Sequence, residues 1–182
     1  MKQVVCLLTF CLFFQVGAAQ KFGFIDGNFI LNKMESYRKA QSELDNFSKR
    51  AETEVQVKFK EVADMKLKYQ AEELVLTDEM KRERQLEIEK KEKEAQELQQ
   101  KTFGYEGLLY LKKKELIGPV LEELNKAVEK VARKQALQVV YDKSSDFIIV
   151  YLDPRHDYTE YVLEELGLGN PEDNPRENAN RP

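Results

Sequence analysis

The feature that most limits the fold is a pair of long, charge-rich helical patterns, residues 34–76 and 78–134, with short β-like segments on either side. The first pattern contains neither glycine nor proline. Its apolar residues recur every three or four positions, which places them on one helix face: Tyr37, Ala40, Leu44, Phe47, Ala51, Val55, Phe59, Val62, Met65 and Tyr69. Two such helices predict an antiparallel hairpin, roughly 60 Å long at 1.5 Å per residue.

The hairpin tip is predicted at Leu74-Val75-Leu76, where the helical period is lost. Thr77 follows as an N-cap, with two acidic residues in the next first turn. The returning segment 81–101 is dominated by charge, and its apolar residues are few: Leu86, Ile88, Ala95 and Leu98. A seam this sparse should pack weakly, so we expect the tip half of the arm to be flexible.

Glycine and proline mark two places in the returning helix. Gly104 and Gly107 should lie opposite Phe47 and predict a bend, or a place where that ring packs on bare backbone. Gly118-Pro119 should lie opposite the start of the outgoing helix and mark the point where the arm enters the base.

The flanking segments predict a small β-rich base. Residues 21–31 suit one buried strand followed by a turn at 26–28, and 137–141 with 147–152 suit a β-hairpin. Residues 157–160 offer a capping box, and a short helix 161–166 stops at Gly167. So small a core favours association of several chains through the base.

The predicted fold class is therefore α+β, mainly α, with a long antiparallel helical hairpin arm on a small β-rich association base. The arm spans residues 34–118 with its tip near 75–78, and the base combines 20–33 with 119–168. The Asn- and Pro-rich tail, 169–182, is expected to be disordered.

Residues 1–19 are typical of a cleaved secretory signal. Lys2 supplies the positive start, residues 4–16 an apolar stretch too short to span a bilayer, and 17–19 a small-residue cleavage site. An uncleaved membrane anchor is the alternative. Both cysteines, Cys6 and Cys11, lie within the signal, so the mature chain from residue 20 is expected to have no disulfide and no lipid anchor.

The charge distribution and the missing motifs argue for binding and against catalysis. Residues 38–75 and 78–117 each carry equal numbers of acidic and basic residues, so the arm offers no field for nucleic acid. No phosphate loop, serine elbow or dinucleotide motif occurs, and His156 is the single histidine, too few for a metal site. We therefore expect no enzyme activity, catalytic residue, metal or cofactor; a hydrolase in the base stays a minor alternative.

Three segments resemble the Skp/OmpH family of periplasmic chaperones: FGFIDGNFIL, PVLEELNKAVEKVARKQALQVVYDKSS and IIVYLDPRHDYTEYVLEEL. The resemblance covers nearly the whole mature chain in order. It implies a periplasmic homotrimer whose strands form a central body, with three arms that hold unfolded outer-membrane proteins without ATP. One departure is that this arm is neutral, whereas better-known members have basic arms, which argues against contact with lipopolysaccharide or the membrane surface.

Two groups of residues are predicted to carry this function. Six apolar residues off the hairpin seam are candidates for client contact: Val57, Met65, Leu67, Tyr69, Leu74 and Leu76. For Met65 and Tyr69, packing within the hairpin is at least as good an interpretation. Strand residues are candidates for oligomerisation: Phe22, Phe24, Ile25, Val139, Tyr141, Ile148, Val150 and Leu152. The alternative function is a non-catalytic envelope spacer or adaptor that binds a folded partner through the hairpin.

Overall fold

The computed structural model describes residues 20–145 and 148–169. The expected signal peptide and most of the expected tail therefore lie outside the described residues, as do Asp146 and Phe147. The chain divides into two compact units. Residues 31–125 form the first, which we call the arm, and the described parts of 1–30 and 126–182 form the second, which we call the base.

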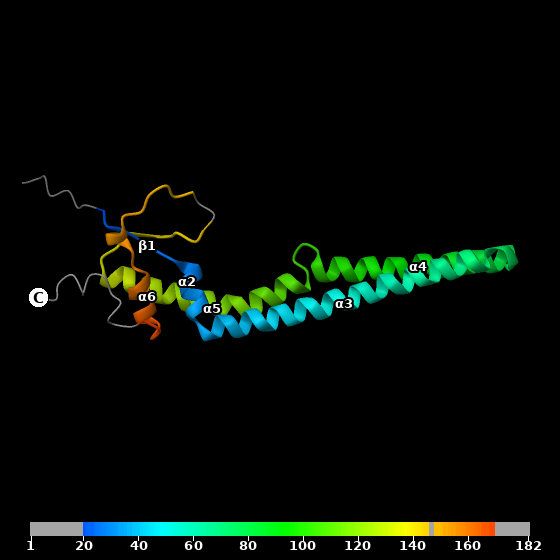
Figure 1. Cartoon of the computed structure of the whole chain (residues 1–182), viewed down its shortest axis with the longest axis horizontal. Helices are drawn as coiled ribbons and strands as arrows, with labels where there is room; N and C mark the ends of the chain where they lie inside the picture. The colour runs from blue at the N-terminus through cyan, green and yellow to red at the C-terminus, as the bar shows by residue number, and fades with distance from the viewer. Residues whose placement is uncertain (1–19, 146–147, 170–182) are drawn as a thin grey trace, which may run out of the picture. The chain divides into compact units, whose positions relative to one another are not determined.

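The arm is the predicted antiparallel hairpin (Figure 1). Helix α3 (Glu35–Glu72) runs out to a single 3-10 turn, η1 (Glu73–Val75), and α4 (Asp78–Phe103) runs back along it. Thr77 is the N-cap of α4, and its hydroxyl oxygen accepts from the Met80 N–H at 3.3 Å. The tip and its cap were thus predicted correctly, because a lost helical period and a Thr followed by carboxylates are local signals.

The seam between α3 and α4 is narrow. Its buried cluster consists of Val62, Ile88 and Ala95, against which Phe59, Met65 and Tyr69 pack. Lys66 of α3 adds an ion pair with Glu92 of α4 at 2.8 Å. Four residues of the apolar repeat in α3 therefore face α4, as their spacing predicted: Phe59, Val62, Met65 and Tyr69.

The sequence predicted a single returning helix with a bend, but the structure divides this segment into two helices. Helix α4 ends at Phe103, a loop of four residues follows, and α5 (Leu108–Lys134) begins a new helix. The loop bulges away from the hairpin in Figure 1. The two glycines therefore end one helix instead of bending it. Ser48 of α3 lies across from the break, and its neighbour Phe47 is only half-buried.

Pro119 lies inside α5 and neither ends nor interrupts it, so the arm's entry into the base at this point stays a prediction. A proline in a helix frees the carbonyl four residues earlier, here that of Glu115. Both Pro119 and Glu115 are exposed. Water can therefore solvate the freed carbonyl, which lowers the penalty for continuing the helix through Pro119.

The base contains one parallel two-stranded sheet, β1 (Phe22–Ile25) with β2 (Val139–Asp142), in the register Phe22 to Val139. The predicted β-hairpin is not formed: residues 148–152 carry no strand, and β2 pairs with β1. Parallel pairing needs a long crossover, and the whole hairpin supplies one between these strands. On its other side β1 bonds to the segment at Asp157-Tyr158, where the Tyr158 N–H donates to the Phe24 carbonyl at 2.8 Å.

The predicted turn at residues 26–28 is instead the start of a helix, α2 (Gly27–Lys33). Its N-terminal N–H groups are capped by three side chains of the base. The Phe29 N–H donates to Asp26 Oδ1 at 2.9 Å, the Gly27 N–H to Asp142 Oδ1 at 2.9 Å and the Asn28 N–H to Ser144 Oγ at 3.1 Å. Two of these acceptors come from the end of β2 and the turn that follows it, a long-range cap that local patterns do not reveal.

A 3-10 turn, η2 (Pro154–His156), leads into the terminal helix α6 (Thr159–Glu165). One local and one long-range hydrogen bond hold the start of this helix: Asp157 Oδ1 accepts from the Thr159 N–H, and Thr159 Oγ1 accepts from the Asp26 N–H, both at 2.9 Å. Helix α6 completes the core of the base. The most deeply buried side chains there are Ile30, Tyr158, Val162 and Leu163.

Candidate functional site

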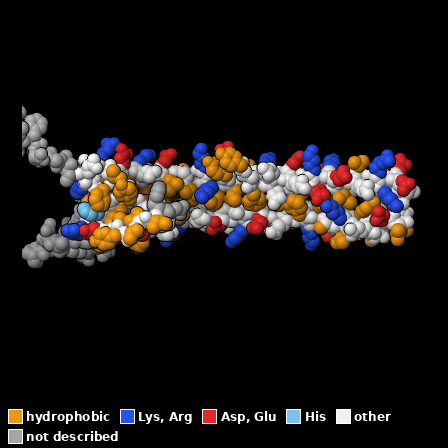
Figure 2. Space-filling model, turned by 90° about the horizontal axis from the view of Figure 1, so that it is seen from above, with side chains coloured by type: hydrophobic (Ala, Val, Ile, Leu, Met, Phe, Trp, Pro, Cys, Tyr) orange, Lys and Arg blue, Asp and Glu red, His pale blue; other side chains and the backbone are white. Residues whose placement is uncertain are grey.

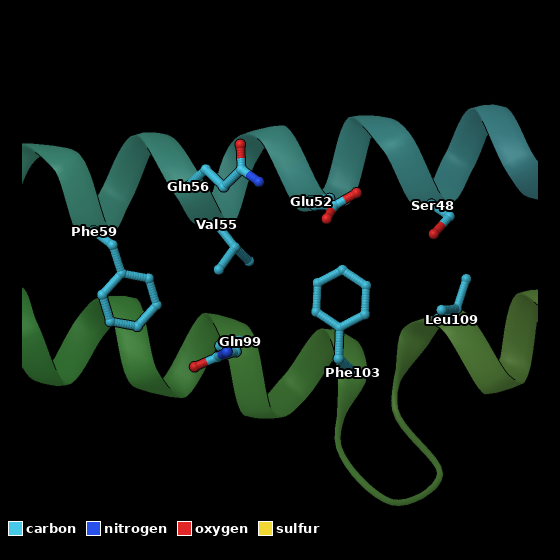
Figure 3. A pocket seen from close by; sticks show the side chains of 8 residues that line it. All are labelled: Ser48, Glu52, Val55, Gln56, Phe59, Gln99, Phe103 and Leu109. Carbon is cyan, nitrogen blue, oxygen red and sulfur yellow. The ribbon is translucent and has the colours of Figure 1, made fainter.

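A cleft opens in the arm where α4 gives way to α5 (Figure 3). It has a volume of about 590 Å³. Phe59 extends into it from α3 and Phe103 from the end of α4, so two aromatic rings from opposite helices face the same gap. We call this feature the break cleft; its lining residues are Ser48, Glu52, Val55, Gln56, Phe59, Gln99, Phe103 and Leu109.

The loop beside the cleft requires both of its glycines. A Cβ on Gly104 would lie 2.3 Å from the Gln100 carbonyl oxygen, and one on Gly107 would lie 2.8 Å from the carbonyl oxygens of Lys101 and Thr102. Glu106 adopts a left-handed backbone conformation with φ of 51°. Because side chains at 104 and 107 would collide with backbone, the sequence encodes this break directly.

The cleft is apolar at its base and polar at its rim. Val55 is buried, and the rings of Phe59 and Phe103 stand beside it. Glu52, Gln56 and Gln99 are exposed, and Ser48 is half-buried. Within the described part of the chain, none of these four polar side chains forms a hydrogen bond or ion pair, so their donors and acceptors are available to a ligand.

Large apolar side chains are exposed around the same break. Tyr105 is 94% exposed and Phe103 40%, and three residues at the start of α5 are also exposed: Leu108, Tyr110 and Leu111. Figure 2 shows a hydrophobic patch part-way along the arm among mixed charges. This group was not predicted, because the two glycines alone indicate only a helix irregularity; the signal was the aromatic run around them, FGYEGLLYL.

The predicted client-contact residues divide into two sets. Val57, Leu67 and Leu74 are exposed, Leu74 to 97%, and Leu76 is half-buried at the tip. Met65 and Tyr69 instead pack on the seam cluster, and the Tyr69 hydroxyl accepts from Gln85 Nε2 at 2.9 Å. Those two side chains contribute to the hairpin itself, and the four others lie along α3 and its tip.

The predicted oligomerisation residues also divide. Phe24 and Ile25 are in the core of the base, and Leu152 is half-buried. Phe22, Val139 and Tyr141 are exposed on the two strands, and Ile148 and Val150 are 95% and 94% exposed after β2. Five of the eight predicted side chains are thus exposed on the base, and they form the kind of apolar surface that often marks an interface.

Charged side chains link the segments of the base through ion pairs and hydrogen bonds. Lys143 pairs with Asp26 at 3.4 Å and Asp157 at 3.5 Å, and its ammonium lies 5.7 Å from the centre of the Phe24 ring. Burial raises the pKa of Asp142, but hydrogen bonds from Ser144 and from the Gly27 N–H outweigh this effect and leave the pKa below its ordinary value. At Asp153 the hydrogen bond from Arg155 lowers the pKa to about 2.

Comparison with known proteins decides the family. A family model described as outer membrane protein (OmpH-like) matches residues 21–166, most of the chain. The chain belongs to the OmpH-like family. This is the OmpH/Skp-like family of outer membrane chaperones, which are not enzymes, so both the resemblance drawn from the terminal motifs and the non-enzymatic prediction are confirmed.

A solved structure has the same fold. It is a candidate outer membrane chaperone (OmpH-like) from Caulobacter crescentus CB15, with a TM-score of 0.62 and 13% identity over 82% of this chain and 85% of that chain. No curated protein sequence matches this OmpH-like chain. In residues 20–145 and 148–169, no helix has the length and apolar character needed to cross a membrane.

The OmpH-like motifs now have physical explanations. In VVYDKSS, Asp142 and Ser144 cap α2, and Lys143 bridges two aspartates. In LDPRHDYTEYVLEEL, Asp157 and Thr159 join α6 to the turn after β1. These motif residues therefore hold the segments of the base together.

Proposed function

We propose that this OmpH-like protein is an ATP-independent periplasmic holdase, which keeps unfolded outer-membrane proteins soluble between its arms before they insert into the membrane. Export would use residues 1–19 as a cleaved signal. The observation that supports the proposal most directly is the set of exposed apolar side chains along a hairpin that otherwise carries balanced charge. Unfolded β-barrel chains expose apolar side chains and unpaired strand edges, which such a surface can bind weakly at many points.

Association of three copies through the base is the second part of the proposal. Phe22, Val139 and Tyr141 are exposed on a sheet of only two strands, and a sheet this small is marginal by itself. Ile148 and Val150 lie in a β-branched, aromatic segment that forms no strand within the described residues. A neighbouring copy could cover these side chains and pair with the open edge of β2, which would remove an exposed strand edge.

Light scattering tests both parts in one experiment. The mature chain, residues 20–182, is measured alone and after addition of a urea-diluted outer-membrane β-barrel protein. We expect a mass of three chains, and a soluble complex that retains the client. A monomer, or an oligomer that leaves the client to precipitate, would contradict the holdase proposal and favour an envelope spacer.

A variant separates assembly from client binding. Ile148→Ser with Val150→Ser removes two exposed apolar side chains of the base and leaves the arm unchanged. We expect a smaller mass by light scattering, because the apolar contact between copies is lost. The matched control is Val57→Ser with Leu67→Ser on α3, which should leave the mass unchanged and weaken retention of the client.

A further inference from the structure

We propose that the break cleft binds one aromatic side chain with a polar edge, tyrosine or tryptophan, from an extended polypeptide, and favours a basic residue beside it. The inference deepens the proposed holdase function and rests on it, because the polypeptide in question is the client. It assigns a defined side-chain site to one place on an arm whose other apolar residues are exposed on the surface.

The shape of the cleft suits a flat side chain. Its volume of about 590 Å³ lies within the range of small-ligand pockets, roughly 300–1,000 Å³. Phe59 and Phe103 extend from opposite helices toward the gap, with the buried Val55 between them (Figure 3). An aromatic ring entering there would meet ring faces and edges, the contacts that aromatic side chains favour, whereas an aliphatic chain would gain only buried area.

The rim selects an aromatic group that has a hydrogen-bonding end. Ser48, Gln56 and Gln99 supply a hydroxyl and two amides, and none of these side chains has a bonding partner within the part of the chain that the structure describes. A buried tyrosine O–H or tryptophan N–H needs such a partner, and phenylalanine does not. The cleft should therefore distinguish tyrosine and tryptophan from leucine strongly, and from phenylalanine to a smaller degree.

Charge decides which neighbours the aromatic residue should have. Glu52 is the one charged residue that lines the cleft, and its carboxylate is in no ion pair within the described residues. A lysine or arginine next to the bound aromatic would approach this carboxylate, and an acidic residue there would be repelled. The predicted ligand is thus a cationic aromatic peptide in an extended conformation.

The loop that creates the cleft is fixed before any ligand arrives. The Gly104 N–H donates to the Gln100 carbonyl at 2.8 Å, and the Gly107 N–H to the Gly104 carbonyl at 2.9 Å. Since any side chain at either glycine would collide with backbone, the end of α4 and therefore Phe103 are held in place by the local sequence. A preformed site loses less entropy when it binds.

The absence of tryptophan from the whole chain gives a clean assay. The probe is the peptide acetyl-Gly-Lys-Trp-Gly-Gly-amide, titrated with the mature protein while its tryptophan fluorescence is recorded. We expect a saturable blue shift. A peptide with Glu in place of Lys should bind at least three times more weakly, and a peptide with Leu in place of Trp should fail to compete at equal concentration.

Two variants assign the signal to the cleft. Phe103→Ala should weaken probe binding about tenfold or more, and Glu52→Gln should keep the binding but remove the preference for Lys over Glu. The matched control is Leu86→Ala, which removes an exposed apolar side chain of the same helix outside the cleft. Equal affinity for Phe103→Ala, Leu86→Ala and the unaltered protein, or equal competition by the leucine peptide, would overturn the proposal.

A parallel assay separates this proposal from the holdase function. Each protein is mixed with a urea-diluted outer-membrane β-barrel protein, and the soluble client is measured. If the unaltered protein keeps the client soluble while the peptide binds without regard to Phe103 and Glu52, the cleft proposal fails and the holdase function stands. If the client precipitates even with the unaltered protein, the holdase function fails, whatever the peptide does.

Discussion

The arm and the base differ in how each residue is held. In the base, a side chain such as Tyr158 is enclosed by strands, a turn and a helix from distant parts of the sequence, and polar groups such as Asp142 and Thr159 tie those parts together. In the arm, helix α3 meets the returning helices α4 and α5 across a thin seam, and most other contacts are between neighbours in the chain. The base should therefore unfold as a unit, whereas the arm can open locally.

The largest expected effect is the loss of Tyr158, which is fully buried in the base. Tyr158→Ala should lower the free energy of unfolding by about 4 kcal/mol, because deleting a large buried ring removes both apolar burial and packing. Amide hydrogen exchange should show lost protection at β1, β2 and α6 together. The control is Tyr110→Ala on the exposed part of α5, which should change stability little. Protection lost at α6 alone would contradict a cooperative base.

A smaller and local effect is expected in the arm. Ile88→Ala removes the largest buried side chain of the seam cluster, where it lies with Val62 and Ala95. We expect a loss of about 2 to 3 kcal/mol, at the low end for such a change because the thin seam can close around the gap. Hydrogen exchange should accelerate in α3 and α4 near the cluster and stay unchanged at β1 and β2. Leu86→Ala, at an exposed position of α4, is the control.

The same contrast explains what could be predicted from the sequence. The long helices, the tip and the Thr77 cap follow from local spacing and capping chemistry, which an isolated segment already expresses. The partner of β2 could not be predicted from the neighbouring sequence. Residues 137–152 have the pattern of a hairpin, yet β2 pairs in parallel with β1, and the whole arm separates these two strands in the sequence. The start of α2 was missed for the same reason, since two of its caps, Asp142 and Ser144, come from far along the chain.

The break cleft was missed for a different reason. Gly104 and Gly107 signalled an irregularity, but whether glycines bend a helix or end it depends on backbone contacts such as those with the Gln100 carbonyl. The exposure of Val57, Leu67 and Leu74 could be predicted because these residues lie off the apolar repeat of the helix, whereas their contact with a client stays a prediction. Residues that line a cavity between helices follow no repeat in the sequence, so they could be identified only from the three-dimensional structure.

Low pH should destabilise the fold of the base, because it protonates the Asp142 carboxylate. Its pKa in the folded protein lies below the ordinary value of 3.8, so the unfolded chain binds the proton more tightly. The stability due to this carboxylate is therefore fully present at neutral pH and is lost as the pH falls below about 4. Asp142→Asn should reduce the free energy of unfolding by about 2 kcal/mol at pH 7, because hydrogen bonds to a charged acceptor are replaced by neutral ones.

Urea denaturation at pH 7, 4.5 and 3 checks this prediction. The difference between the unaltered protein and Asp142→Asn should shrink as the pH falls, since protonation neutralises the same carboxyl that the variant lacks. Asp64→Asn, which alters an exposed carboxylate of α3, serves as the control and should show almost no difference at any of these pH values. A constant difference for Asp142→Asn would mean that shape, and not charge, makes residue 142 important.

The smallest expected effect is at the ion pair that joins the two arm helices, Lys66 with Glu92 at 2.8 Å. Both side chains are more than a third exposed, so water screens the pair and the two long side chains lose freedom in forming it. A double-mutant cycle with Lys66→Gln and Glu92→Gln should give a coupling of about 0.5 kcal/mol, which 1 M salt abolishes. A coupling above about 1.5 kcal/mol that survives salt would show that the arm is held by charge more than by its apolar seam, and the contrast with the base would then need another explanation.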